Sequence, residues 1–549
     1  MDHFRAGRRP YTAAAALMTT VVVAQSVGAA VCLLALLAGL PLWAAIVAAA
    51  AFGGALFTRV GGRFAVAWIG TVLGLLGDRR PTIGRTTDFH TASETVGLHW
   101  VAGQVVAVVE LLPPSGHWSR LTRERVESPD HLPVAALASC LNQHDVALGG
   151  IDVVAHGSRA VTGTPAAEVY DNLVGPLPAV ARRTVWVALR FDAAADGASV
   201  ARRGGGEEGA ARTVAVAARR VVRALGDAGY ASRILPATDV ESAAALICRG
   251  VHPDAMDQQW SHVPLQGLCN TGNAIHPRHL SRELLTAVWA HPGVGTTVTV
   301  RLRPAADKDS VLVGAAFRTT TRAVPSRGLR HPGLISMQGR HRDALVAQLP
   351  VSSPDLDHLT PLLATDPAHL DRLHLPVAGC GQLVGSDAQG HAVAIRLSGP
   401  GVRDVLVGGE LYLAQQVVFR AVGTGARVLV HTDRPHAWTA LVEAIGAPSR
   451  LRLAHGSAWA ETGFDTLVVD GPPTPPARPG VTTVHVQPTA APASATVPTV
   501  DVSILQPGAS GDRVILTTGG RSIDLALVTI SSETAFLGRP RPSRLVGAH

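Results

Sequence analysis

The chain has 549 residues, 47% of them hydrophobic and 16% charged, which permits several domains with large cores and excludes an intrinsically disordered protein. Its formal charge is +7, but residues 1–85 alone hold eight arginines and two aspartates, a net of +6, so the rest is close to neutral. A basic excess confined to this segment, without finger spacing or an RNP-like cluster, argues against a nucleic-acid-binding protein.

The first 58 residues predict a membrane anchor. Two uncharged apolar runs, 12–38 and 42–58, follow a basic head at 1–11. The first run exceeds the ~20 apolar residues that cross a bilayer core, and the second is at the short end of that range. Arginines precede the first run and follow the second, which predicts two transmembrane helices with both termini in the cytoplasm. A cleaved signal peptide has a shorter apolar region, and buried core helices rarely lack charge for so long.

A third apolar stretch, 64–76, has 13 residues and is too short to span a membrane. Trp68 and the flanking arginines would suit a helix that lies along the inner membrane surface. A short buried helix of the following domain is the alternative. We assign residues 59–90 to a basic, amphipathic juxtamembrane segment.

Alternating and helical patterns in 91–250 predict a layered α/β domain. Strands are expected at 98–112, as one strand or a hairpin, and at 147–155, 184–191 and 231–235, and helices at 133–142, 166–173, 207–229 and 239–248. Residues 251–375 form a less regular α/β region, in which 296–302 and 311–319 resemble paired strands.

Residues 376–549 predict a Rossmann-like α/β extension. A hairpin at 382–397 precedes a unit with strands at 405–407, 427–431 and 464–469, helices at 410–422 and 436–445, and a closing hairpin at 514–528. Prolines make 472–498 a loop. The predicted fold class is therefore α/β, with an N-terminal two-helix transmembrane hairpin followed by cytosolic layered α/β domains.

Two glycine-rich turns are the nearest approach to a cofactor motif. The G-x-G-x-x-G string at 204–209 opens a helix, but a dozen residues separate it from the preceding strand and two glutamates occupy its first turn, which favours a structural helix start. The turn at Gly408 and Gly409 lies between a strand and a helix, and Asp433 ends the next strand. These three residues are weak candidates for nucleotide binding, because the third glycine of the motif is absent and Glu410 stands where phosphate would bind.

No other motif supports catalysis. The only lysine, Lys308, has no glycine-rich loop, so there is no Walker A site. Val468-Val469-Asp470 resembles a Walker B strand without its companion, and the pair His276 and His279 has no acidic or cysteine ligand beside it. We therefore predict no catalytic residues, no metal site and no cofactor.

Several stretches resemble the EccE family, a membrane component of the mycobacterial type VII (ESX) secretion machinery. The resemblance spans about residues 10–250 and includes the apolar N-terminus with its arginine-rich exit. The matching residues are Gly97-Leu98-His99-Trp100, 141–154, Tyr170, 175–178, Arg190 and Arg202-Arg203-Gly204-Gly205-Gly206.

The resemblance implies a structural, non-enzymatic subunit of the inner membrane that supports the assembly or stability of EccB, the ATPase EccC and EccD, with a mycosin protease as a further partner. Membrane lipids would be bound and nucleic acid would not. The alternative is a membrane-anchored enzyme or sensor that binds a nucleotide or nucleotide-sugar at the turn of Gly408 and Gly409.

Overall fold

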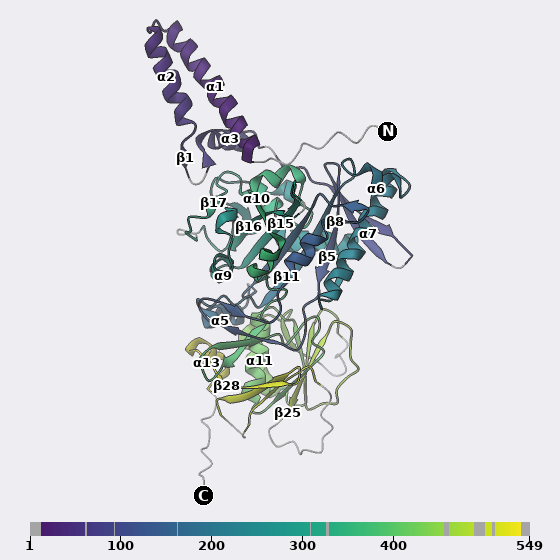
Figure 1. Cartoon of the computed structure of the whole chain (residues 1–549). Helices are drawn as coiled ribbons and strands as arrows, with labels where there is room; N and C mark the ends of the chain where they lie inside the picture. Colours follow the sequence, from purple (N-terminus) through teal and green to yellow (C-terminus); the bar gives the residue numbers. More distant parts are fainter. Residues whose placement is uncertain are drawn as a thin grey trace.

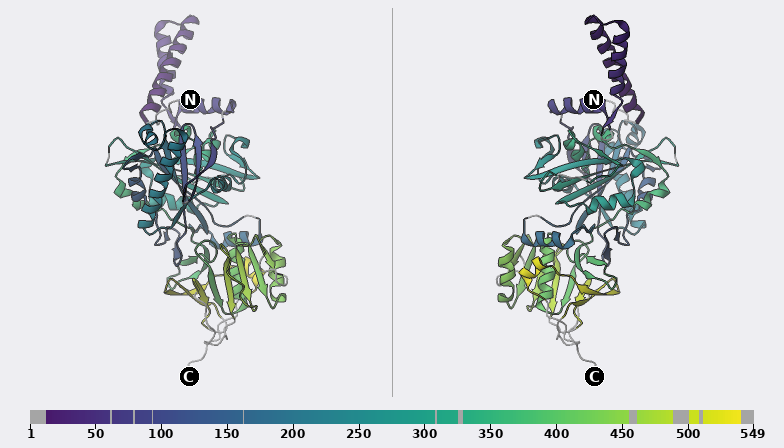
Figure 2. Two further views of the ribbon diagram at one scale, coloured as in Figure 1. Left: turned by 90° about the vertical axis from the view of Figure 1, so that its right-hand side faces the viewer. Right: turned by 90° about the vertical axis from the view of Figure 1, so that its left-hand side faces the viewer.

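The protein is mixed α/β and elongated, with a helical hairpin, a first large sheet and a second large sheet in succession (Figures 1 and 2). This computed structural model describes residues 13–60, 63–78, 80–92, 94–161, 163–307, 309–324, 329–454, 461–487, 500–507 and 511–539. The predicted α/β class is confirmed. The basic head at 1–11, Lys308 and residues 488–498 of the predicted loop lie outside the described residues. Within the described part of that loop, Thr482–Gln487 form a strand, which corrects the prediction, because a run of β-branched residues follows the prolines.

The N-terminal helices α1 (Ala13–Leu37) and α2 (Leu42–Ala55) lie side by side and project from the rest of the molecule (Figure 1). Within the described residues, no helix has both the length and the apolar character that a membrane crossing requires. Two helices therefore form in the predicted apolar runs, but the predicted transmembrane hairpin is not supported. The 14 residues of α2 rise only about 21 Å, less than the ~30 Å of a bilayer core.

Helix α3 (Ala65–Leu76) lies across the base of the hairpin and rests on the first sheet region (Figure 2). The Trp68 and Trp260 rings are 5.6 Å apart, and Gly339 leaves no room for a side chain beside Thr71. Just after the helix, Asp78 accepts from Arg342 at 2.8 Å. One side of α3 is therefore held by the protein body, while Leu73 and other apolar side chains remain exposed.

The first sheet is antiparallel, and its main strand order is β13-β14-β16-β15-β10-β11-β5-β4-β3. β12 pairs with β5, β17 with β14 and β18 with β16. The strands are β3 (Arg85–His90), β4 (Thr95–Val101), β5 (Gln104–Leu111), β10 (Gly150–Ser158), β11 (Arg182–Asp192), β12 (Ser232–Ile234), β13 (Val263–Leu265), β14 (Leu268–Ile275), β15 (Gly295–Pro304), β16 (Val311–Thr321), β17 (Leu334–Ser336) and β18 (Leu363–Thr365). The hairpin expected at 98–112 is β4-β5, and the expected pair at 296–319 is β15-β16.

Helices cover both faces of the first sheet, because successive strand residues alternate between two apolar cores. One core contains Ile151 and Leu189 together with α4 (Val134–Ser139), α7 (Gly206–Asp227) and α9 (Arg282–Ala290). The other contains Val154 and Ala188 together with α8 (Ala237–Cys248), α10 (His341–Val346) and the 3-10 helix η3 (Pro354–Leu359). The expected layered α/β arrangement is therefore present.

The second sheet has the order β23-β22-β24-β25-β21-β26-β27-β28-β19-β20-β6-β7. Neighbours from β23 to β26 are parallel, and the remaining neighbours with a recorded register are antiparallel. Its strands are β6 (Trp118–Leu121), β7 (Val126–Glu127), β19 (Gln382–Ser386), β20 (Ala392–Ile395), β21 (Asp404–Gly408), β22 (Val428–Thr432), β23 (Leu451–Leu453), β24 (Thr466–Asp470), β25 (Thr482–Gln487), β26 (Val502–Leu505), β27 (Arg513–Thr518) and β28 (Arg521–Leu527). The two hairpins expected in this region, β19-β20 and β27-β28, are confirmed.

Helices α5 (Pro165–Val174), α11 (Leu411–Gly423), α12 (His436–Ile445) and α13 (Ser531–Leu537) share one apolar core with this sheet. The glycine at position 423 fits α11 closely against α5, since a Cβ there would lie 2.7 Å from the Ala166 carbonyl oxygen. The smaller elements are β1 (Arg59–Val60), β2 (Arg63–Phe64), β8 (Asn142–Gln143), β9 (Val146–Ala147), α6 (Gly197–Ala201), η1 (Pro253–Ala255), η2 (Pro277–His279) and η4 (Pro367–Leu373).

Two features of the second sheet depart from a simple Rossmann half. A mononucleotide-binding half places its first two strands side by side. Here β25 and β24 lie between β21 and β22, so α11 connects strands that are not neighbours. In addition, β6 and β7 come from 118–127 and pair with β20, which places part of the predicted 91–250 segment in this sheet. The predicted domain boundaries themselves stay predictions.

Candidate functional site

The predicted turn at Gly408 and Gly409 leads from β21 into α11, but its backbone amides already have partners. The Gly409 N–H donates to the Gln487 carbonyl oxygen at 3.0 Å, and the Glu410 N–H donates to Gln506 Oε1 at 2.8 Å. Gly409 has φ +150, and the Gln506 side chain occupies the space beside it. A phosphate bound by these amides would have to displace both acceptors, so the geometry does not favour nucleotide binding at this turn.

Asp433 follows β22, whereas the turn follows β21, and the strands β24 and β25 lie between these two. Its carboxylate packs against Gly471, where a Cβ would come within 2.5 Å of Asp433 Oδ2. The sheet therefore does not bring Asp433 together with Gly408 and Gly409, and their role as a site stays a prediction.

Asp470, the residue that resembles a Walker B aspartate, is buried and fully engaged. Arg434 donates to both its oxygens at 2.7 and 2.9 Å, and the Trp438 indole donates at 2.8 Å. Burial alone would raise the pKa of Asp470, but these hydrogen bonds outweigh it and lower that pKa. The carboxylate is thus an internal acceptor that holds α12 against the sheet.

In the structure, a third histidine lies near the pair that was considered as a metal site. His276 and His279 have ring centroids 5.9 Å apart, and His331 lies 5.7 Å from His279. Across the described part of the chain, however, no group of three or more His, Cys, Asp or Glu residues could hold a metal ion.

A buried charge cluster on the first sheet joins strands that are distant in sequence. Arg190 on β11 and Arg303 on β15 contact Asp152 on β10 at 2.9 and 2.6 Å. Asp357 of η3 accepts from Arg190 and Arg301 at 3.0 and 2.9 Å and from Arg303 at 3.3 Å. Three guanidinium groups therefore share two carboxylates inside the protein.

Gly150 makes this cluster possible, because a Cβ there would meet the Arg303 guanidinium at 2.5 Å. The three nearby guanidinium groups lower the pKa of Asp357 despite its burial, with Arg190 contributing most. Sequence reasoning noted Asp152 and Arg190 only as part of a resemblance. The alternation of Arg301 and Arg303 on one strand face was the signal that could have indicated a charged cluster.

The hairpin carries many apolar side chains that are exposed to solvent. Leu33, Leu37 and Trp43 are 60%, 76% and 71% exposed. Further exposed apolar residues include Met18, Val22, Leu34, Ile46, Val47 and Phe52. An exposed apolar surface of this extent is typical of an interface with a membrane or another protein.

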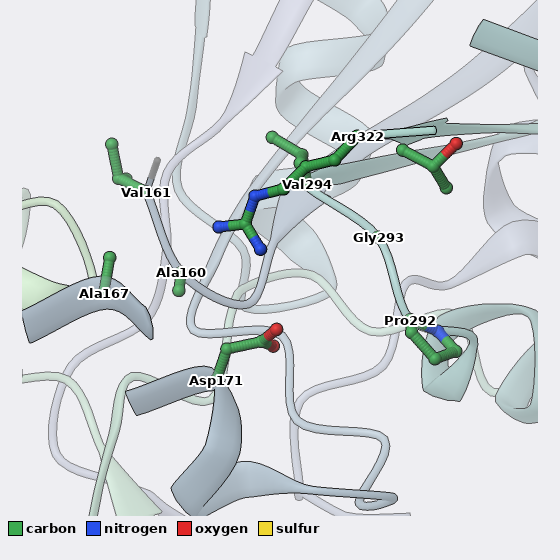
Figure 3. Close-up of a pocket in the computed structure, with 9 residues that line it drawn as sticks. Ala160, Val161, Ala167, Asp171, Pro292, Gly293, Val294 and Arg322 are labelled. Atoms are coloured by element: carbon green, nitrogen blue, oxygen red, sulfur yellow. The ribbon is translucent and has the colours of Figure 1, made fainter. Parts of the chain in front are cut away.

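The junction between the two sheet regions contains a pocket of about 220 Å³. Asp171 of α5 and Arg322, which follows β16, lie on different sides of it, and the Arg322 side chain extends into the space above Asp171 (Figure 3). Pro292 and Gly293 line another side. The pocket offers one carboxylate and one guanidinium, a pair suited to a polar contact rather than to a reaction.

Comparisons with known proteins connect this structure to one family. Residues 179–275 match the family model described as "Putative type VII ESX secretion system translocon, EccE". The matched segment runs from just before β11 to the end of β14 and includes Arg190.

Characterised relatives agree with that match. The chain is 27% identical to the ESX-5 secretion system protein EccE5 of Mycobacterium marinum, over 47% of its own length and 66% of the relative's. It is 26% identical to the ESX-1 secretion system protein EccE1 of Mycolicibacterium smegmatis, over 63% and 66% of the two lengths. It is 29% identical to EccE5 of Mycobacterium tuberculosis, over 52% and 71%.

The chain thus spans slightly less than two thirds of the first two of these relatives. The family model matches part of the first-sheet region, in which the resemblance to EccE was expected. The chain is therefore similar to proteins of the EccE family.

Proposed function

We propose that the protein is a structural, non-enzymatic component of a type VII ESX secretion system, and that it supports the assembly or stability of a membrane complex with EccB, EccC and EccD for protein export. A mycosin protease is a further proposed partner. The similarity to EccE proteins of ESX secretion systems supports the secretion role. The exposed apolar surface of α1 and α2 is the observation that carries the membrane role.

The hairpin is the proposed membrane anchor. Burying its exposed leucines and Trp43 in an apolar phase releases about 25 cal/mol for each Å² removed from water, whereas leaving them in water favours aggregation. The basic residues at both ends of the apolar segment favour an arrangement with both termini and the two sheet regions in the cytoplasm. The specific form of this proposal is that the hairpin inserts into the inner membrane.

Contacts at the base of the hairpin would fix the orientation of the first sheet region relative to the anchor. Trp68 packs on Trp260, and Asp78 joins Arg342 near the start of α10. These contacts come from a helix that follows the hairpin directly in sequence. In such a complex, these contacts would hold the first sheet at a fixed distance from the membrane surface.

Membrane association is tested by fractionation of cells that express the full chain. The double variant Leu33→Arg with Leu34→Arg places two charges on the apolar hairpin surface and should move most of the protein out of the carbonate-resistant membrane fraction. Leu246→Arg is the matched control, because Leu246 is 53% exposed on α8 and lies outside the hairpin. Equal fractionation of the two variants would contradict the anchor.

Complex formation is tested by affinity purification of the tagged wild-type chain after mild detergent extraction. EccB, EccC and EccD should copurify with it, and their yield should fall in the Leu33→Arg, Leu34→Arg variant. A wild-type chain that elutes free of all three proteins would contradict the structural role in this complex without affecting the anchor.

A further inference from the structure

A second junction cavity, of about 600 Å³, lies between the two sheet regions and is more strongly charged than the pocket in Figure 3. The segment 116–131, which contains β6 and β7, forms one wall. The rest of the cavity lining comes from the start of α9, the residue after η4 and the start of β28. Its lining includes four arginines and two histidines, Arg120, Arg125, Arg282, Arg521, His131 and His374.

Two of the four arginines in this wall have carboxylate partners. Arg120 contacts Asp387 at 3.2 Å, and Arg125 contacts Glu127 at 2.7 Å. Among the described residues, neither Arg282 nor Arg521 has a carboxylate within 4.0 Å. Arg282 is half-buried at the first position of α9 and lines the cavity without a carboxylate partner.

The cavity continues inward past Ser128, His131, Arg282 and His374 toward Arg183. The Arg183 guanidinium lies 4.3 Å from the centroid of the Trp289 ring and donates to the Ala378 carbonyl oxygen at 3.0 Å. Its Nε, and Nδ1 of His374, are buried without a hydrogen-bond partner in the described structure. Buried polar atoms normally have partners, so these two indicate a missing acceptor or donor.

The arginines of the cavity wall favour a negatively charged ligand with oxygen acceptors, that is, an oxyanion. Arginine donates hydrogen bonds in a planar fork that fits phosphate, and such charge-assisted bonds are stronger than neutral ones. Burial lowers the pKa of His131 to about 4, with smaller contributions from His374 and Arg282, so at neutral pH its ring is uncharged and the positive charge comes from the arginines. A volume of about 600 Å³ is within the range of small-molecule sites.

The position of the cavity determines the source of the ligand. The hairpin leaves the first sheet region at one end, and the junction with the second sheet is at the other (Figure 1). A headgroup of the membrane that holds the hairpin could not reach the junction. We propose that this cavity binds a small soluble molecule that carries phosphate groups. The choice of a soluble ligand over a lipid headgroup rests on the proposed membrane anchor, whereas the binding of phosphate groups rests on the cavity alone.

Titration calorimetry on the full chain in detergent micelles, with pyrophosphate as the probe, tests the proposal. Saturable binding is expected, measured against sodium chloride at the same ionic strength. Arg282→Gln should weaken binding tenfold or more, because it removes an otherwise unpaired guanidinium. Arg521→Gln, at an exposed position, should weaken it several-fold without risk to folding.

Arg223→Gln is the matched control, since Arg223 is an exposed arginine of α7 and does not line the cavity. It should bind pyrophosphate like the wild type. The proposal is overturned if the wild type shows no saturable binding, or if Arg521→Gln and Arg223→Gln, each with an unchanged melting temperature, bind equally well.

Discussion

The two sheet regions bury arginine in different ways. In the first, Arg190, Arg301 and Arg303 share two aspartates on one face of a single sheet. In the second, Arg420 of α11 pairs with Glu533 of α13 through bonds of 2.7 and 2.8 Å and also donates to the carbonyl oxygens of Leu383 and Val384.

This difference predicts that the loss of a carboxylate lowers the free energy of unfolding more in the first region than in the second. The first cluster has an excess of positive charge, so removing one aspartate leaves three buried guanidinium groups with a single counter-charge. In the second region, the carbonyl acceptors around Arg420 remain when Glu533 is neutralised. A buried charge without a partner costs far more than a hydrogen-bonded one, because its solvation by water is not replaced.

The largest expected effect is therefore that of Asp357→Asn, which we predict to lower the free energy of unfolding by about 3 kcal/mol or more. Urea unfolding of the full chain in detergent measures it, and faster amide exchange in β10, β11 and β15 locates it. Asp355→Asn changes an exposed carboxylate two residues away and should cost less than about 0.5 kcal/mol. Equal losses in both variants would mean that the cluster is not a stabilising unit.

For Glu533→Gln we expect the free energy of unfolding to fall by about 2 kcal/mol, because glutamine preserves the shape and one acceptor but not the charge. Exchange should become faster in α11 and α13 and stay unchanged in the first sheet. Glu443→Gln, at an exposed position of α12, is the control. A loss larger than that of Asp357→Asn would reverse the comparison between the two regions.

The smallest expected effect is a dependence on pH that arises in the first region. His99 lies on the sheet face that carries Arg190, and burial, followed by the charge of Arg190, lowers its pKa to about 4. The unfolded chain takes up this proton near pH 6.5, whereas the folded chain does so only near pH 4, so stability is complete above pH 6.5 and decreases as the pH falls toward 4.

Between pH 7 and pH 5.5 the contribution of His99 should amount to roughly 1 kcal/mol. His99→Gln should flatten the pH dependence of urea unfolding by that amount. His369→Gln, which changes an exposed histidine, should leave the wild-type slope unchanged. If both variants retain that slope, His99 is not the group that titrates.

Local patterns predicted many helices and strands. The uncharged runs at 12–38 and 42–58 became α1 and α2, and the glycine-led helix expected at 207–229 is α7. These predictions succeeded because hydrophobic periodicity and turn residues act over a few positions. The transmembrane prediction went further than the structure supports, since the apolar run at 42–58 is longer than the helix that forms in it.

Long-range pairing could not be predicted. Trp118 on β6 pairs with Ile395 on β20, and no local pattern relates two segments so far apart in sequence. The same applies to Asp357, which reaches Arg190 and Arg301 only because η3 folds back over the sheet. The separation of Asp433 from Gly408 has the same origin, because β24 and β25 come later in the chain and still lie between β22 and β21.

The sequence by itself determined the apolar hairpin, the α/β class and the resemblance to EccE, because composition, periodicity and short motifs are properties of neighbouring residues. Only the tertiary structure decided which strands pair, which arginines share carboxylates and which remain unpaired at the junction. Those outcomes depend on distances between residues that are far apart along the chain, and in a buried setting such distances decide whether a charge is stabilised or available to a ligand.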